Sequence, residues 1–223
     1  MNPTAFVDLL VEVRLNNVFN PYVDTCPVFD RVDAAAYRRG NLRTFLAAAV
    51  ELEVDTIWMG RDLGHRGGRR TGVALTDEHH LSDLDRLYPG SKSRQATRGP
   101  AMAERTAAEI WDALGRIPRP PLLWNVFPFH PHEPDKPLSN RRFTAKELSD
   151  VDEINRVLIA WLGIRRIVAI GQDAAHYAKG FGVEVLTVRH PSYGGVREFR
   201  EGIQSLYPAI RQRRVSEPRS ALL

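Results

Sequence analysis

Four short, continuously apolar runs rich in β-branched and aromatic residues most constrain the fold of this chain. A run without polar alternation is typical of a strand buried on both faces, as in a parallel sheet. Segments of helical periodicity separate the runs. We therefore expect an α/β fold, a three-layer α/β/α sandwich with a mostly parallel four-stranded central sheet. The predicted strands are 54–59, 120–127, 165–170 and 183–188, and the predicted helices are 34–52, 101–115, 145–163 and 172–180.

The length of 223 residues suits a single domain, 1–223, with a full hydrophobic core. No apolar stretch reaches the roughly 18 residues that a membrane span needs. Cys26 is the only cysteine, which excludes an internal disulfide and a four-thiolate cluster. We expect a soluble, cytoplasmic, monomeric protein without a cofactor.

The net charge of +4 and the pI of about 9.4 permit a polyanionic partner but do not require one. Arginines form two groups, one in a glycine-rich stretch and one in the last residues. We interpret the tail, 211–223, as a solvated chain end and the first group as the more informative. The two groups are Arg61, Arg66, Arg69 and Arg70, and Arg211, Arg213, Arg214 and Arg219.

Ligands of an open parallel sheet bind outside the carboxyl ends of its strands. The segments that follow the predicted strands are mostly rich in His, Arg, Gly or Pro. The segment 60–100 also runs about forty residues without a convincing long helix, and such segments are usually functional or disordered. These four segments, which we call strand exits, are 60–72, 128–134, 171–176 and 189–195.

Three of these exits carry a family resemblance. The stretch "VRHPSYGG" (188–195) resembles the His-Pro-Ser motif of the uracil-DNA glycosylase superfamily. "GRDLG" (60–64) resembles its catalytic turn, which reads Gly-Gln-Asp-Pro-Tyr or Gly-Glu-Ala-Pro-Gly in members, and 65–78 is similar to the arginine- and glycine-rich extension of iron-sulfur relatives. "LLWNVFPFHP" (122–131) resembles the strand whose asparagine reads uracil. The chain is thus identified as a divergent member without the cluster cysteines.

The resemblance implies two catalytic residues. Asp62 takes the place of the catalytic aspartate, which would stabilise an oxocarbenium-like sugar and orient the attacking water. His190 would donate a hydrogen bond to the base oxygen that gathers negative charge. The alternatives are a turn cap for Asp62 and, for His190, closure of its loop through the backbone.

The resemblance also implies a site for an extruded base. Asn125 offers both an acceptor and a donor to the base edge, although an asparagine in an apolar strand also fits a structural hydrogen bond. Gly60, Arg61 and Leu75 are assigned to base recognition with it. Leu75 stands where members place an aromatic ring that stacks on the base.

The expected partner is DNA, single or double stranded, containing a damaged or deaminated base. Phosphate contacts are expected from basic side chains and from the backbone of the His-Pro-Ser loop, with Tyr193 as a wedge into the base stack. The alternatives are a solvated basic loop and a tyrosine packed on its own domain. The assigned DNA-binding residues are Arg66, Arg69, Arg70, Pro191, Ser192, Tyr193 and Gly194.

A second Gly-Gln-Asp turn, at 171–173, precedes the late His-Pro-Ser loop rather than following an early strand. We therefore interpret Gln172 or Asp173 as a helix cap and not as a catalytic group. His130 and His132 do not complete a metal shell, and no metal is expected.

The predicted function is that of a monofunctional DNA glycosylase, which removes uracil or another deaminated base by base flipping in base excision repair. The alternative is a catalytically weak or inactive protein that binds nucleic acid or a modified base. Leu63 in place of the family proline, together with Leu75, motivates this alternative. A hydrolase of free nucleosides or nucleotides is a third possibility.

Overall fold

The computed structural model describes residues 1–208, so the arginines of the predicted tail lie outside the described residues. A four-stranded sheet forms the centre of the fold, and all its neighbouring strands are parallel, in the order β3-β2-β5-β6. This confirms the predicted α/β architecture. The strands are β2 (Thr56–Asp62), β3 (Leu122–Phe127), β5 (Arg166–Ile170) and β6 (Glu184–Val188).

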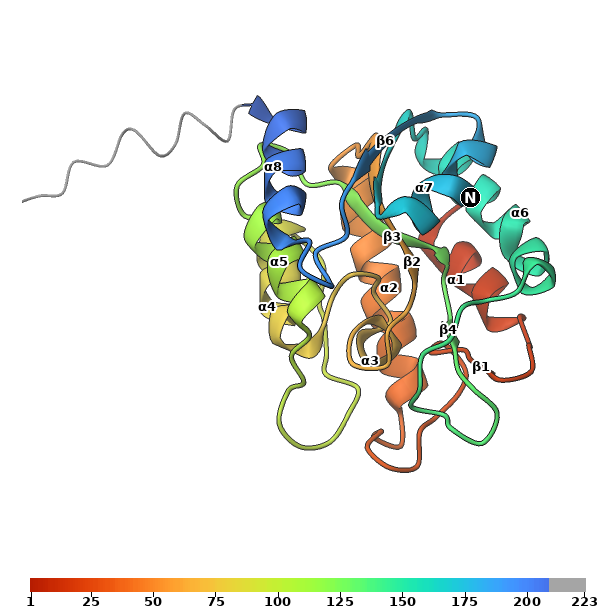
Figure 1. Ribbon diagram of the computed structural model, residues 1–223. Coiled ribbons are helices and arrows are strands. Elements are labelled where there is room, and N and C mark those ends of the chain that lie inside the picture. Colours follow the sequence, from red (N-terminus) through yellow and green to blue (C-terminus); the bar gives the residue numbers. More distant parts are fainter. Residues whose placement is uncertain (209–223) are drawn as a thin grey trace, which may run out of the picture.

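Helices cover both faces of this sheet. Figure 1 shows α5 and α8 on one side of the strands and α6 and α7 on the other. The helices are α1 (Pro3–Val11), α2 (Ala34–Glu51), α3 (Gly68–Thr71), α4 (Leu81–Leu87), α5 (Arg105–Leu114), α6 (Ala145–Leu162), α7 (Gln172–Ala178) and α8 (Val196–Leu206), with 3-10 turns η1 (Glu78–His80) and η2 (Lys179–Phe181).

The strand β3 is buried along its whole length, as its apolar run predicts. A buried polar contact ties it to α6. The Asn155 side chain accepts from the Trp124 indole at 2.8 Å and donates to the Val126 carbonyl at 2.8 Å. Because both bonds are buried, they fix the position of α6 against β3, the outer strand of the sheet, which carries Asn125.

A capping box begins α6. The backbone N–H of Glu147 donates to Thr144 Oγ1 at 3.2 Å, and the backbone N–H of Thr144 donates to the Glu147 carboxylate at 2.7 Å. These bonds satisfy backbone groups that a helix start otherwise leaves unpaired. Glu147 also pairs with Arg141, so the helix start is fixed to the segment that precedes it.

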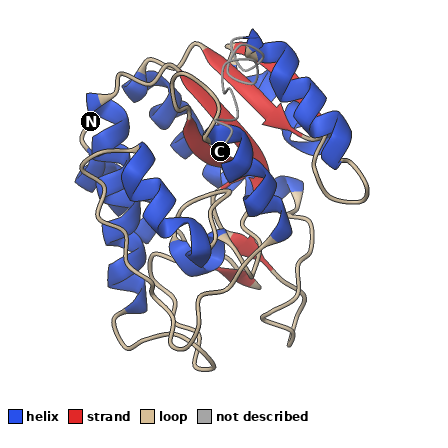
Figure 2. Ribbon diagram, turned by 90° about the vertical axis from the view of Figure 1, so that its left-hand side faces the viewer, coloured by secondary structure: helices blue, strands red, loops and turns tan. Residues whose placement is uncertain are grey.

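A small antiparallel ribbon of β1 (Val18–Phe19) and β4 (His130–Pro131) lies apart from the main sheet, at the end of the fold where loops gather (Figure 2). Since β4 follows β3 after only two residues, this end is the carboxyl edge of the sheet. Within residues 1–208, no helix is long and apolar enough to cross a membrane.

Candidate active site at the carboxyl edge of the sheet

The strand β2 continues past its predicted end and includes Gly60, Arg61 and Asp62. Parallel pairing places Gly60 beside Asn125 and Asp62 beside Phe127. The sheet register therefore brings the "GRD" stretch and the asparagine of β3 together, as the motif order suggests.

The backbone at Gly60 leaves room for two neighbouring side chains. A β-carbon at this position would collide with Asn125 Oδ1 and would lie 3.0 Å from Leu75 Cδ2. Leu75 itself has a left-handed backbone, with φ of 56°, which is uncommon for a residue other than glycine. The side chains of Leu75 and Asn125 thus pack against the backbone of Gly60 near the end of β2.

The amide of Asn125 is buried, and its Oδ1 has no hydrogen-bond partner among the described residues. The structural hydrogen bond that would explain a buried asparagine is therefore absent for this oxygen. A buried polar atom without a partner is rare and calls for a specific reason. A ligand that donates a hydrogen bond at this place would satisfy Asn125.

The side chain of His190 lies against Gly171, where a β-carbon would come within 3.2 Å of His190 Cβ. The backbone N–H of Ser192 donates to His190 Nδ1 at 3.1 Å, and Ser192 Oγ lies 2.7 Å from the same nitrogen. Because Nδ1 accepts, the neutral ring carries its proton on Nε2. His190 closes its own loop through Nδ1 and keeps Nε2–H as a donor.

Burial, followed by the positive charges of Arg61 and Arg189, lowers the pKa of His190 below its usual value. The neutral imidazole is therefore favoured at neutral pH. A neutral donor suits a leaving group that gathers negative charge without taking a full proton.

The Asp62 carboxylate is largely buried, and burial raises its pKa above the ordinary range. Within residues 1–208 its hydrogen-bond partner is a guanidinium rather than a backbone N–H: Arg61 Nε lies 2.5 Å from Asp62 Oδ2. Arg61 Nη1 reaches a second carboxylate, Asp173 Oδ2, at 3.1 Å. The Arg61 side chain, assigned to base recognition, is thus engaged by two acids.

The helix α7 begins at Gln172, and no side chain of its first turn caps it. The expectation that Gln172 or Asp173 acts as a cap is therefore wrong. Gly171, with φ of 94°, occupies the cap position, and Asp173 pairs with Arg61 and Arg142 instead. The second Gly-Gln-Asp turn belongs to the neighbourhood of Asp62 after all.

Two of the three arginines expected to contact phosphate lie in the interior. Arg69 is 2% exposed, and its guanidinium lies 4.0 Å from the Phe19 ring centre. Arg70 is 7% exposed, lies 3.8 Å from the Phe29 ring centre and pairs with Glu78 at 3.5 Å. A contact with DNA needs a surface group, so the structure corrects this expectation for both residues.

Arg66 remains exposed, as a phosphate contact requires. The His-Pro-Ser loop presents Tyr193, which is 97% exposed and has φ of 51°. The alternative of a tyrosine packed on its own domain is therefore excluded. Gly194 follows with φ of 79°, so the backbone turns sharply directly after the exposed tyrosine.

The carboxyl group of Glu104 is a feature that motif reading missed. It fills the space beside two loop glycines, since a β-carbon would lie 3.0 Å from its Oε1 at Gly64 and would collide with its Oε2 at Gly67. Burial, then the negative charges of Asp77 and Asp62, raise its pKa. Gly64 and Gly67 are a sequence feature compatible with a side chain packed there.

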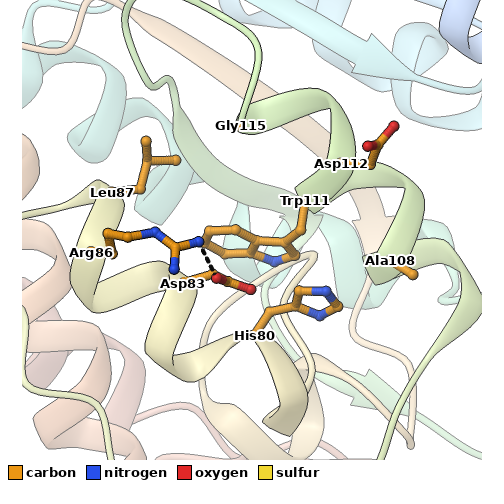
Figure 3. Close-up of a pocket in the computed structure, with 8 residues that line it drawn as sticks. All are labelled: His80, Asp83, Arg86, Leu87, Ala108, Trp111, Asp112 and Gly115. Carbon is orange, nitrogen blue, oxygen red and sulfur yellow. Dashed lines mark hydrogen bonds and ion pairs between the residues drawn. The ribbon is translucent and has the colours of Figure 1, made fainter. Parts of the chain in front are cut away.

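A surface cavity of about 460 Å³ lies between α4 and α5. Figure 3 shows Trp111 across its centre, with the His80 ring near it and Arg86 paired with Asp83. The rings of His80 and Trp111 stack with centres 5.8 Å apart. None of the predicted site residues lines this cavity.

Among the described residues, no three His, Cys, Asp or Glu side chains gather in an arrangement that could hold a metal ion. His130 is bonded to the Ser139 carbonyl through Nε2 at 2.8 Å. Burial, then the charge of Arg69, lowers the pKa of His130 to about 3. His130 is thus a neutral interior group.

No protein-family model and no curated protein matches this sequence. The structure is similar to the crystal structure of wild-type SMUG2 from Pedobacter heparinus, a member of the uracil-DNA glycosylase superfamily, with a TM-score of 0.62 and 14% sequence identity. The match covers 97% of this chain and 100% of that chain. The chain therefore has the α/β fold of the uracil-DNA glycosylase superfamily.

Proposed function

We propose that this protein is a monofunctional DNA glycosylase that hydrolyses the N-glycosidic bond of uracil or another deaminated base in DNA. The observation that carries the proposal is the buried Asn125 amide, whose Oδ1 has no hydrogen-bond partner within residues 1–208 and which lies against Gly60, two residues from Asp62. An extruded uracil offers an N3–H donor and an O4 acceptor, and Asn125 can pair with both.

In the proposed reaction the C1′–N bond breaks, which leaves positive charge on the sugar and negative charge on the base. The Asp62 carboxylate stabilises the sugar cation and orients a water molecule for attack at C1′. The water adds its oxygen to C1′ and loses one proton to Asp62 or to solvent, and the base leaves as an anion that takes up a proton from solvent. His190 Nε2–H donates to the base oxygen where charge develops.

Delivery of the base requires contact with the DNA backbone and a substitute for the lost base in the stack. Tyr193, nearly fully exposed at the tip of the His-Pro-Ser loop, is proposed as the wedge. Pro191, Ser192 and Gly194 would bring backbone amides near phosphates, and Arg66 would add a salt-sensitive contact.

A second candidate function is binding of nucleic acid or a modified base without turnover. Leu75 favours it, because its side chain packs at Gly60 where the family places a stacking aromatic ring. Stacking of a base on an aromatic side chain contributes about 1–3 kcal/mol, which a leucine does not fully replace.

One assay separates the two functions. Labelled oligonucleotides with a single uracil, hypoxanthine, xanthine or mismatched thymine, single and double stranded, are incubated with protein and cleaved with alkali at the resulting abasic site. We expect release of at least one base, with a loss of about 10²-fold or more for Asp62→Asn and for His190→Ala. Glu184→Gln, which alters an exposed ion pair with Arg166, serves as the matched control.

Tight, salt-sensitive DNA binding without release of any base would reject the glycosylase and support the binding protein. Release from free deoxyuridine as fast as from DNA would instead indicate a nucleoside hydrolase.

A further inference from the structure

The proposed reaction needs an ionised Asp62 and a neutral His190. Burial by itself disfavours the ionised form of Asp62. Burial raises the pKa of Asp62, whereas the hydrogen bond and positive charge of Arg61 lower it. The same guanidinium lowers the pKa of His190. Arg61 thus favours the required charge state of both groups.

Arg61 also pairs with a second carboxylate. Its Nη1 lies 3.1 Å from Asp173 Oδ2, and Arg142 Nη2 lies 3.2 Å from the same oxygen. The Arg61 side chain is about one-third exposed, so a flexible guanidinium with one partner would exchange with water. The second carboxylate reduces that freedom.

We propose that Asp173 is a positioning residue of this site, which holds Arg61 against Asp62 and thereby fixes the orientation and charge of the Asp62 carboxylate. The inference rests on the proposed function for its kinetic consequence only. The ion-pair arrangement of Asp62, Arg61 and Asp173 is a property of the folded chain.

Asp173 also acts on Asp62 directly, and in the opposite direction. As a like charge it raises the pKa of Asp62, while Arg61 and, more weakly, Arg141 lower it. The negative charge of Asp62 in turn contributes to the raised pKa of Glu104, a further carboxyl group near the site. Removal of Asp173 can therefore raise or lower the pKa of Asp62. The direction distinguishes a residue that positions Arg61 from one that acts only as a like charge.

The test is the Asp173→Ala variant, with the Asp62 carboxyl followed by carbon-13 NMR across pH and with the pH profiles of kcat and kcat/KM for base release. If Asp173 positions Arg61, the Asp62 titration and the acid limb of the profile move upward by about one pH unit, and kcat falls more than KM rises. A downward shift or no shift would overturn the proposal, because Asp173 would then act as a like charge only or not at all.

Arg61→Gln should shift the Asp62 titration in the same direction as Asp173→Ala and by more. Glu184→Gln removes a carboxylate from another exposed arginine pair and should leave the titration unchanged. Asp173→Asn, whose amide oxygen still accepts from Arg61, should recover most of kcat. The NMR titration of Asp62 tests the positioning role of Asp173 even if the wild type releases no base. Failure of this proposal can therefore be told apart from failure of the proposed glycosylase function.

Discussion

The amide of Asn125 occupies the space that a β-carbon at Gly60 would need. The two residues are paired in register on neighbouring parallel strands, so neither can move without a change in the sheet. Only a residue without a side chain at position 60 allows the Asn125 amide its present place.

Gly60→Ala should displace the Asn125 side chain. Since the obstacle is a side-chain atom, we expect the fold to survive with a loss of about 1–3 kcal/mol in the free energy of unfolding. Base release should fall about 10²-fold, because a shift of about 1 Å is enough to lose that factor. Gly40→Ala, at a helical position with nothing within 4 Å, is the matched control and should retain activity. Equal activity of both variants would contradict a role for Asn125 in base recognition.

His190 should be neutral with its proton on Nε2 at pH 7. Its pKa in the folded chain is lowered, so the neutral form persists as the pH falls below the ordinary histidine value of about 6.5. Nitrogen-15 NMR of the ring should therefore show an acceptor-type Nδ1 and a titration below that pH. Observation of the Nδ1–H tautomer would contradict the bond from the Ser192 backbone.

Tyr193→Ala should separate folding from function. The ring is almost fully exposed, so the free energy of unfolding should change by less than about 0.5 kcal/mol. If the ring replaces the extruded base in the stack, base release from duplex DNA should fall more than release from single strands. A parallel fall on both substrates would argue against a wedge.

Substitution by Met should affect stability at Arg70 and DNA binding at Arg66. Arg70 pairs with the buried Glu78, so Arg70→Met leaves this carboxylate with its hydrogen bonds from Thr97 and the Met102 backbone but without its cation, and should cost about 3 kcal/mol of stability. Arg66→Met should leave stability unchanged and weaken DNA binding, with a salt dependence reduced by about one phosphate contact. Urea unfolding and binding across salt concentrations measure the two effects, and a stable Arg70→Met protein would contradict the structural role.

Glu104→Gln should change how stability depends on pH. The pKa of Glu104 is raised in the folded chain, so the folded state holds the proton more tightly than the unfolded state. Stability therefore falls as the pH rises from the ordinary glutamate pKa through the raised one. We expect the variant to be more stable than the wild type above this interval and to lose that advantage at lower pH. Urea unfolding at several pH values tests this, and an advantage that grows at acid pH would contradict it.

The sheet was predictable because a strand buried on both faces appears in the sequence as a short, continuous apolar run. All four predicted strands form, although β2 runs three residues further, to Asp62, because Gly60 and Asp62 pair with β3. Helices α1 and α8 were not among the predicted elements.

The placement of Asp62 at the end of β2, of Asn125 within β3 and of His190 just after β6 also followed from the sequence, through motif order. Their catalytic and recognition roles remain predictions. Two features depend on the tertiary structure, because they follow from the donors and acceptors that the fold brings near. They are the Asn125 oxygen that lacks a partner within residues 1–208 and the His190 Nδ1 that accepts from the Ser192 backbone.

The sequence by itself determined the alternation of strands and helices, because side-chain burial repeats with the local period of each element. Only the tertiary structure decided which charges are functional candidates. Arg66 and Arg70 look alike in a glycine-rich stretch, yet Arg70 is buried against the Phe29 ring and pairs with Glu78. Asp173 pairs with Arg61 across 112 residues of chain. A charge acquires its role from partners in space, and a linear sequence does not record those distances.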